Sequence, residues 1–145
     1  MRIEKGVWVL VADGEKFLLL ENVGNHQRVD LQVIRHREVE SPPTREQGTD
    51  QPGRFNDPGP GRSAAEETDW HRLGKERFAK DLAEQLRTWA LGNRFEALVL
   101  AADPRTLGVL RPALHKAVAE RVVGEVDKDL TRMPVGEIER VLQAA

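Results

Sequence analysis

Asp13 and Asp103 stand directly after the first and fourth segments that are predicted to form strands, where carboxylates could hold metal ions. Two-metal phosphoryl transfer needs such carboxylates because the attacking and the leaving oxygens must both be stabilised. A third carboxylate could come from a helix, at Glu66, Glu67 or Glu76. However, Asp13 precedes Gly14 in a predicted turn. Asp103 precedes Pro104 at a predicted helix start, so the sequence favours structural roles for both aspartates.

A short stretch further along the chain offers groups that could bind an anion. Its residues are Gly59, Gly61, Arg62 and Ser63. They stand just before a predicted helix, whose free N–H groups and dipole favour negative charge. The stretch is not a nucleotide-binding phosphate loop, because Asn56 stands where the first Gly should be and Arg62 replaces the Lys. An ordinary helix start, in which Ser63 and Glu66 form a capping box, is the favoured alternative.

Among the three tryptophans, Trp70 is the one that lies among polar residues. His71 and Arg72 follow it directly, so its ring could be an exposed surface on which a nucleobase stacks. Trp8 and Trp89 lie in apolar patterns and are expected in the core. The histidines show no i, i+4 pairing and the chain has no Cys, so neither a zinc site nor a cofactor is predicted.

Residues 40–63 form a long Gly- and Pro-rich loop whose only large apolar side chain is Phe55. Burial of that side chain would contribute about 1.5–3 kcal/mol. Fixing each backbone residue costs about 1–2 kcal/mol, so the loop is expected to be mobile, ordered by polar bonding, or ordered by a partner. Its arginines are balanced by acidic residues, which argues against a simple basic arm. Arg54 and Arg62 would be its useful donors to phosphate, because a guanidinium can grip two phosphate oxygens.

Apolar patterns elsewhere in the chain predict five strands. They are expected at 7–12, 16–21, 29–39, 97–102 and 122–127. Asp13 and Gly14 predict that a type I′ turn joins the first two strands. Alternation at Leu31 and Val33 predicts a third strand with one wet face. The fourth strand is apolar without alternation, which indicates that both of its faces are covered.

Three helices are also expected. The longest carries an apolar stripe at helical spacing, made by Phe78, Leu82, Leu86 and Trp89. It starts either at Ser63 or, after a short turn, near Asp69, and it is expected to stop at Gly92. The second follows the fourth strand and should be kinked or divided by Pro112. The third follows Pro134 at the end of the chain.

The resulting order, βββαβαβα, indicates an α/β fold with a mixed five-stranded sheet and helices on its faces, in a single domain over residues 1–145.

The formal net charge of -2 creates no global field that would attract nucleic acid. The absence of Cys suits a reducing compartment. The apolar run at 7–12 is too short for a signal peptide or a membrane helix, so a cytoplasmic location without a membrane partner is expected.

Four segments together resemble the bacterial host-attachment protein family, named as proteins required for attachment to host cells. The segments are WVLVADGEKFLLLEN, GTDQPGRFNDPGPGRSAAEETDWHRLGKERFAKDLAEQL, LVLAADPRTLGVLR and VDKDLTRMP. The layout is more remotely similar to the middle domain of archaeal and eukaryotic peptide-chain release factors and of their ribosome-rescue relatives. In release factors a Gly-Gly-Gln loop helps water attack peptidyl-tRNA, whereas PGPGRSA in this chain has neither the Gly pair nor the Gln.

The resemblance implies a non-catalytic binding module that acts through residues 44–72, with the ribosome or structured RNA as its partner. The binding residues would be Arg54, Gly59, Gly61, Arg62, Ser63, Trp70, His71 and Arg72. Two alternatives stay open. The element order is also shared by ribonuclease-H-like nucleases, so the chain could be a metal-dependent nuclease that uses Asp13, Asp103 and Glu76. It could instead be a protein–protein interaction module whose loop orders on a protein partner.

Overall fold

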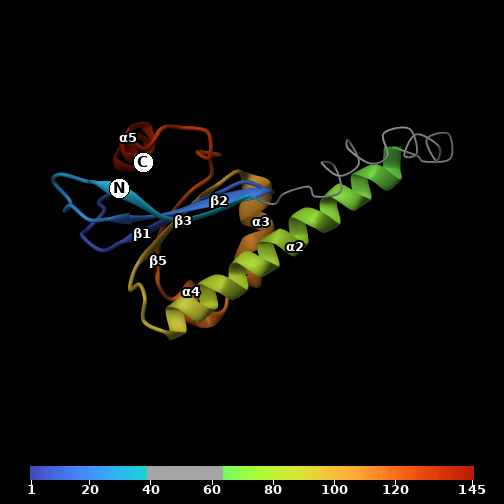
Figure 1. The fold of residues 1–145 in the computed structure, drawn as a ribbon, viewed down its shortest axis with the longest axis horizontal. Coiled ribbons are helices and arrows are strands. Elements are labelled where there is room, and N and C mark those ends of the chain that lie inside the picture. The colour runs from blue at the N-terminus through green and yellow to red at the C-terminus, as the bar shows by residue number, and fades with distance from the viewer. Residues whose placement is uncertain (39–63) are drawn as a thin grey trace.

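The computed structural model describes residues 1–38 and 64–145, and for Glu38 and residues 64–73 it describes the backbone alone (Figure 1). The strands are β1 (Trp8–Ala12), β2 (Lys16–Asn22), β3 (Leu31–Glu38), β4 (Leu98–Ala102) and β5 (Val122–Val126). The helices of this part are α2 (Ala64–Leu91), α3 (Pro104–Ala113), α4 (Lys116–Ala119) and α5 (Val135–Ala144). The loop predicted at 40–63 lies outside the described residues.

The strands form one sheet in the order β3-β2-β1-β4-β5. β2 pairs antiparallel with both β1 and β3, which gives the predicted meander. β4 pairs in parallel with both β1 and β5, so these strands are reached through helical crossovers. Helix α5 covers one face of the sheet, and α2, α3 and α4 cover the other (Figure 1). The predicted α/β fold, a mixed five-stranded sheet with helices on its faces, is confirmed.

Strand β1 is buried along its whole length because both faces of the sheet are covered. Trp8, Leu10 and Ala12 belong to the core on the side of α2, α3 and α4. Val9 and Val11 belong to the core on the side of α5. This alternation is the two-residue period of an extended chain. Every residue of β4 is likewise buried, as its unbroken apolar run predicted.

The β1–β2 turn closes the predicted hairpin, but the predicted type I′ geometry is wrong. The turn residues all lie in the described part of the chain, and none of them has a positive φ. The carboxylate of Asp13 closes the turn instead, since its Oδ1 accepts from the N–H of Glu15 at 2.7 Å and from that of Lys16 at 2.8 Å. The side chain of Asp13 thus stabilises a turn that needs no left-handed backbone.

Strand β3 is more exposed than its sequence predicted. Leu31 is buried, but Val33 is 42% exposed, so the predicted dry face does not continue past Leu31. A β-bulge separates Val33 from Arg35 in the pairing with β2, and Ile34 is the extra residue. β3 is also one of the two edge strands of the described sheet. α5 reaches its beginning, where Glu139 accepts a hydrogen bond from the N–H of Leu31 at 2.8 Å.

Helix α2 runs without interruption from Ala64 to Leu91, so the longer of the two predicted helices is correct. Its apolar stripe packs on the sheet as predicted, with Phe78, Leu82 and Leu86 buried. Trp89 packs against the same core but stays partly exposed, which corrects its predicted core position. The N-terminal part of α2 extends beyond the sheet (Figure 1). No helix in the described residues is both long and apolar enough to cross a membrane.

The end of α2 falls at the predicted place, but a different residue makes it. The left-handed residue is Asn93, with φ 54°, and not Gly92. The N–H of Asn93 donates to the carbonyl of Ala90 at 3.0 Å, and the N–H of Arg94 donates to that of Trp89 at 2.9 Å. These two bonds make a Schellman motif, in which Asn can replace Gly at the left-handed position.

Asp103 and Pro112 have their predicted roles in the segment that follows β4. Asp103 caps α3, and its Oδ2 accepts from the N–H of Thr106 at 3.1 Å. α3 ends directly after Pro112 and the chain continues as α4, so the predicted helix is divided.

Arg111 of α3 donates from Nε to Glu125 of β5 at 2.8 Å. This hydrogen bond and the attraction of the carboxylate raise the pKa of Arg111 above its ordinary value.

Asn22, at the end of β2, is a buried polar residue that ties two segments together. Its Nδ2 donates to the carbonyl of Ile3 at 3.0 Å and to that of Glu4 at 3.1 Å. Its Oδ1 accepts from the N–H of Gly24 at 3.0 Å and from that of Asp30 at 2.9 Å. The N-terminal segment and the β2–β3 loop are therefore held by one amide side chain.

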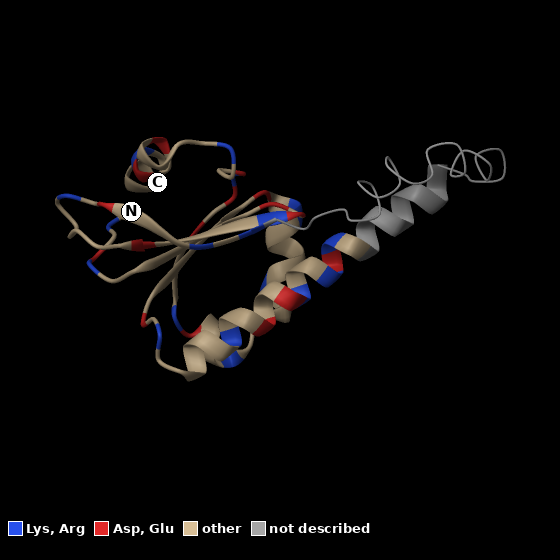
Figure 2. Cartoon of the chain, viewed as in Figure 1, with Lys and Arg blue, Asp and Glu red and all other residues tan. Residues whose placement is uncertain are grey.

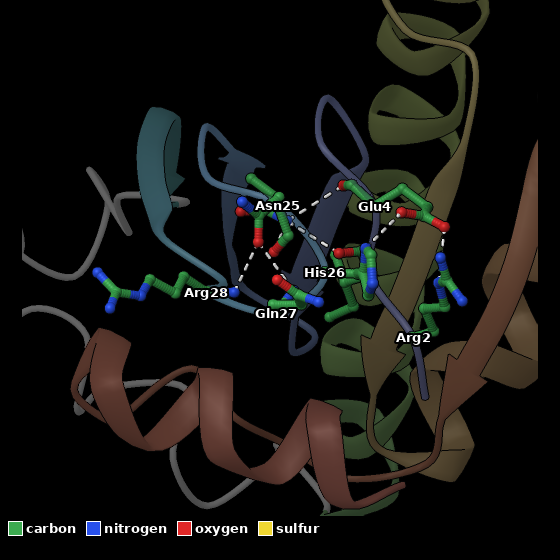
Figure 3. Close-up of polar contacts among 8 residues, drawn as sticks. Arg2, Glu4, Asn25, His26, Gln27 and Arg28 are labelled. Carbon is green, nitrogen blue, oxygen red and sulfur yellow. Dashed lines mark hydrogen bonds and ion pairs between the residues drawn. The ribbon is translucent and has the colours of Figure 1, made fainter.

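Polar contacts at the surface continue this link between the two segments (Figure 3). Glu4 accepts from Nε of Arg2 at 2.7 Å, and its other carboxylate oxygen lies 3.3 Å from Nδ1 of His26. Within the loop, Oδ1 of Asn25 accepts from the two backbone N–H groups that lie two and three residues further on, each at 2.8 Å (Figure 3). These bonds use the polar groups of the loop for its own conformation.

Replacing Leu82 by alanine should lower the free energy of unfolding by about 2–5 kcal/mol, because the side chain is buried between α2 and the sheet. Urea denaturation followed by circular dichroism measures this change. Leu91→Ala is the matched control on the same helix, since Leu91 is 54% exposed. The control should stay within about 0.5 kcal/mol of the parent. An equally small loss in Leu82→Ala would show that the assigned face of α2 is wrong.

Candidate functional site

The binding residues predicted in the loop lie outside the described residues. They are Arg54, Gly59, Gly61, Arg62 and Ser63. Trp70, His71 and Arg72 belong to α2, and their side chains are also outside the described part. The structure does place the two elements that flank the loop, because β3 leads into it and α2 follows it.

A cleft of about 230 Å³ opens at the edge of the sheet where β1 and β4 end. It is lined by Asp13, Gly14, Glu15, Lys75, Asp103, Arg105, Thr106 and Asp129. β1 and β4 are parallel neighbours with Ala12 opposite Ala102, so the residues that follow the two strands meet at one edge. In open α/β sheets, ligands bind in crevices at the carboxyl ends of strands where the strand order reverses.

Asp13 lies between the β1–β2 turn and the segment after β5 at this cleft. Its Oδ1 serves the β1–β2 turn, and its Oδ2 lies 3.4 Å from the hydroxyl of Thr131. That hydroxyl donates to Oδ1 of Asp129 at 2.5 Å, and the N–H of Thr131 donates to the same oxygen at 2.9 Å. Thr131 is buried, so the segment after β5 packs close to the turn after β1. Asp13 is therefore a turn residue, as the sequence favoured.

Asp103 is occupied in the same way by the first turn of α3. Besides the backbone bond to Thr106, its Oδ1 accepts from the hydroxyl of Thr106 at 2.6 Å. Both carboxylate oxygens thus have partners inside the protein, and the prediction that Asp103 is a helix cap is confirmed. The structural bonds of Asp13 and Asp103 leave them less free to bind a ligand.

Lys75 connects α2 to the cleft. A Cβ built on Gly14 would lie 2.8 Å from Cγ and Cδ of Lys75, so the lysine stem crosses directly over the β1–β2 turn. This close approach gives a physical reason for glycine at position 14, since a larger residue would force Lys75 to move. Because Lys75 lies one turn before the buried stripe of α2 begins, it joins the extended part of the helix to the sheet edge.

The carboxylates of the nuclease alternative are only partly brought together. Asp13 and Asp103 line the same cleft, but Glu76 is not among its lining residues. Among the residues whose side chains the structure describes, no group of three or more His, Cys, Asp and Glu residues is arranged to hold a metal ion.

The charges of the cleft decide what it could accept. Four carboxylates line it, those of Asp13, Glu15, Asp103 and Asp129, against the two cations of Lys75 and Arg105. The cleft therefore carries net negative charge, which opposes the entry of a phosphate backbone. The described lining of the cleft therefore does not favour a polyanionic ligand.

The sequence did not predict Lys75, Arg105 and Asp129 in the lining of the cleft, nor Thr131 beside Asp13. A signal for Asp129 and Thr131 does exist. They follow the third of three strands that run in parallel, and the carboxyl ends of parallel strands share one edge of a sheet. Lys75 has no such signal, because its place depends on how α2 crosses the sheet.

Comparison with known proteins bears on the whole fold. The sequence model of one protein family, described as bacterial archaeo-eukaryotic release factor family 12, matches residues 6–142. This match covers all of the strands and helices described above, apart from the last residues of α5. No curated protein matches the chain.

Replacing Asp103 by alanine should lower the free energy of unfolding by about 0.5–2 kcal/mol, because α3 loses its capping acceptor. Asp103→Asn keeps an acceptor oxygen and should retain most of the stability. Chemical denaturation of the two variants beside the parent measures the difference. Equal stability of Asp103→Ala and the parent would contradict a capping role and would reopen a functional role for this carboxylate.

Proposed function

The chain belongs to the bacterial archaeo-eukaryotic release factor family 12, and on that basis we propose that it is a translation-related binding module without catalytic activity. Its partner is the ribosome or structured RNA, which it contacts through residues 44–72. The contact residues are those predicted from the sequence, with Arg54 and Arg62 as phosphate donors and Trp70 as a stacking surface.

The observation that carries this proposal is the way α2 leaves the body of the protein. The helix begins at Ala64, yet the first of its described side chains to be buried is Phe78. At 1.5 Å per residue, the intervening part of the helix is about 20 Å long. This part of the helix extends beyond the sheet (Figure 1). Such an arm suits contact with a large partner that the body itself does not enclose.

The charge distribution supports a local contact and not a broad one. In the described part of the chain, Lys and Arg are interspersed with Asp and Glu along α2 and around the sheet (Figure 2). The cleft at the strand ends carries net negative charge. Affinity for a phosphate backbone would then depend on a few arginines of the 44–72 region, whose planar donors suit phosphate.

The missing Gly-Gly-Gln supports the non-catalytic part of the proposal. In this chain the corresponding stretch reads PGPGRSA, and Gln47 and Gln51 stand too far upstream. Hydrolysis of peptidyl-tRNA is therefore not part of the proposed function. The protein would work in the cytoplasm, and an effect on attachment to host cells, which the resemblance to the host-attachment family implies, would be an indirect result of altered translation.

Arg54→Ala combined with Arg62→Ala should weaken binding to purified ribosomes and to structured RNA. The salt dependence of RNA binding should also fall, by about one in slope for each phosphate that an arginine no longer neutralises. Thermal stability should change by less than about 1 kcal/mol, since these are polar loop residues. Co-sedimentation with ribosomes and RNA titrations at several salt concentrations measure the effect.

Arg2→Ala with Arg140→Ala is the matched control, because it removes two exposed arginines that do not belong to residues 44–72. Its affinity for RNA should stay close to that of the parent. If the loop variant binds as well as the parent, the contact through residues 44–72 is wrong. If the parent binds neither ribosomes nor RNA, the nucleic-acid partner is wrong. Pull-down of an RNase-resistant protein complex would then favour the protein–protein interaction module.

A metal-dependent nuclease is the second candidate, because Asp13 and Asp103 do line one cleft. We expect no cleavage of RNA or DNA with Mg²⁺ or Mn²⁺, since these carboxylates are occupied by internal hydrogen bonds. Incubation of labelled RNA and DNA with each metal ion tests this expectation. Cleavage that disappears in Asp13→Asn, while the variant stays folded, would reverse the order of the two candidates.

A further inference from the structure

Arg35 of the edge strand lies over the ring of Trp89 of α2. Its Cζ is 5.4 Å from the ring centroid, within the range of a cation–π contact. Arg35 is exposed, whereas Trp89 is half-buried. We call this pair the Arg35–Trp89 stack. The guanidinium of an exposed residue thus lies over an aromatic ring.

The ring of Trp89 is held in place from behind. Trp8 meets it edge to face, with ring centroids 5.9 Å apart and an angle of 72° between the planes. Trp8 in turn stacks on Phe95 at 4.9 Å and 27°. Trp8 and Phe95 are buried core residues. The ring under Arg35 is therefore a rigid platform, which is what stacking on a protein requires.

A second arginine on an aromatic ring in this protein shows what a structural pair looks like. Arg121 lies 5.7 Å from the ring centroid of Phe95. Its Nε donates to the carbonyl of Ala117 at 3.0 Å, and another guanidinium nitrogen donates to the carbonyl of Phe95. Arg35 makes no hydrogen bond or ion pair with any side chain that the structure describes in the ranges 1–38 and 64–145. None of the described side chains therefore occupies its donors, in contrast to Arg121.

Arg37 adds a second charge on the same face of β3. Arg35 pairs with Leu19, and Arg37 pairs with Phe17. Leu19 and Phe17 both belong to the core beneath α2, so the two arginines share the face that carries the stack. Two residues along a strand separate them by about 6.6 Å. Arg37 is exposed as well.

We propose that the Arg35–Trp89 stack is a second contact for single-stranded RNA, separate from the 44–72 region. A nucleobase stacks on the outer face of the Arg35 guanidinium, and Arg37 contacts the neighbouring phosphate. Arginine planes and tryptophan rings are the groups on which proteins stack unpaired bases. This contact deepens the proposed function and rests on it, because it assigns the RNA partner to a described surface.

The test uses the full chain and an adenosine decamer, an RNA without secondary structure, in anisotropy titrations at low salt. Arg35→Ala should weaken binding about tenfold, as expected when one base loses its stacking partner. Arg35→Lys should weaken it nearly as much, because an ammonium keeps the charge but has no plane. Arg87→Ala is the matched control: it removes the same charge two residues from Trp89, where Arg87 pairs with Glu84 at 2.8 Å.

Quenching of tryptophan fluorescence, compared between the parent and Trp89→Phe, is a second measurement. It would not change if Arg35 had only a structural role. Binding of the decamer should quench tryptophan emission in the parent, and part of that quenching should be lost in Trp89→Phe. Thermal unfolding of each variant verifies that it is folded. A parent that does not bind the decamer, or an Arg35→Ala variant that binds like the parent, would overturn the proposal and leave Arg35 as a cover for Trp89.

Three further outcomes distinguish base stacking at this surface from simple charge attraction and from binding by the loop. Full affinity in Arg35→Lys would mean that the surface recognises charge alone, which overturns stacking. Competition by a glutamate decamer as strong as that by the RNA would mean an acidic protein partner, and would also overturn it. If Arg35→Ala weakens binding while the Arg54 and Arg62 double variant binds ribosomes normally, the loop contact fails and the stack remains.

Discussion

β1 and β4 pair in parallel over five residues, and the places of the other elements follow from that pairing. Parallel strands need a long crossover connection, and α2 provides the connection that leads to β4. The same pairing brings the turn after β1 and the cap of α3 to one edge, where Thr131 of the segment after β5 lies beside Asp13. The long helix and the cleft are therefore two results of one strand pairing.

Much of this fold could be predicted because burial imposes a period on the sequence. The unbroken apolar run of β4, the stripe on α2 and the cap at Asp103 each have one physical interpretation. The errors have local causes. The turn after β1 uses the side chain of Asp13 in place of a left-handed backbone, and Asn93 replaces Gly92 as the left-handed residue at the end of α2. Both depend on bonds that a hydrophobic pattern does not encode.

The candidate sites were predictable only where they follow from strand ends. Asp13 and Asp103 could be expected to meet, because they follow two strands of a predicted sheet. Lys75 reaches the cleft, and Arg35 reaches Trp89, only through the angle at which α2 crosses the sheet. That angle results from the packing of α2 on β1, β2 and α3, so no local signal in the sequence announces it. Trp89 was expected in the core, and its partial exposure is what makes a surface contact possible.

The bulge in β3 makes this edge of the sheet irregular. Asn22 directs its N–H to β1, so Glu21, Leu19 and Phe17 direct theirs to Gln32, Arg35 and Arg37 of β3. The backbone N–H and C=O groups of β3 that face away from β2 then belong to Leu31, Val33 and His36. These residues are not evenly spaced along the strand. Glu139 already occupies the N–H of Leu31. A regular strand from another molecule could not match this spacing, so an edge with exposed Val33 and Ile34 is a poor template for aggregation.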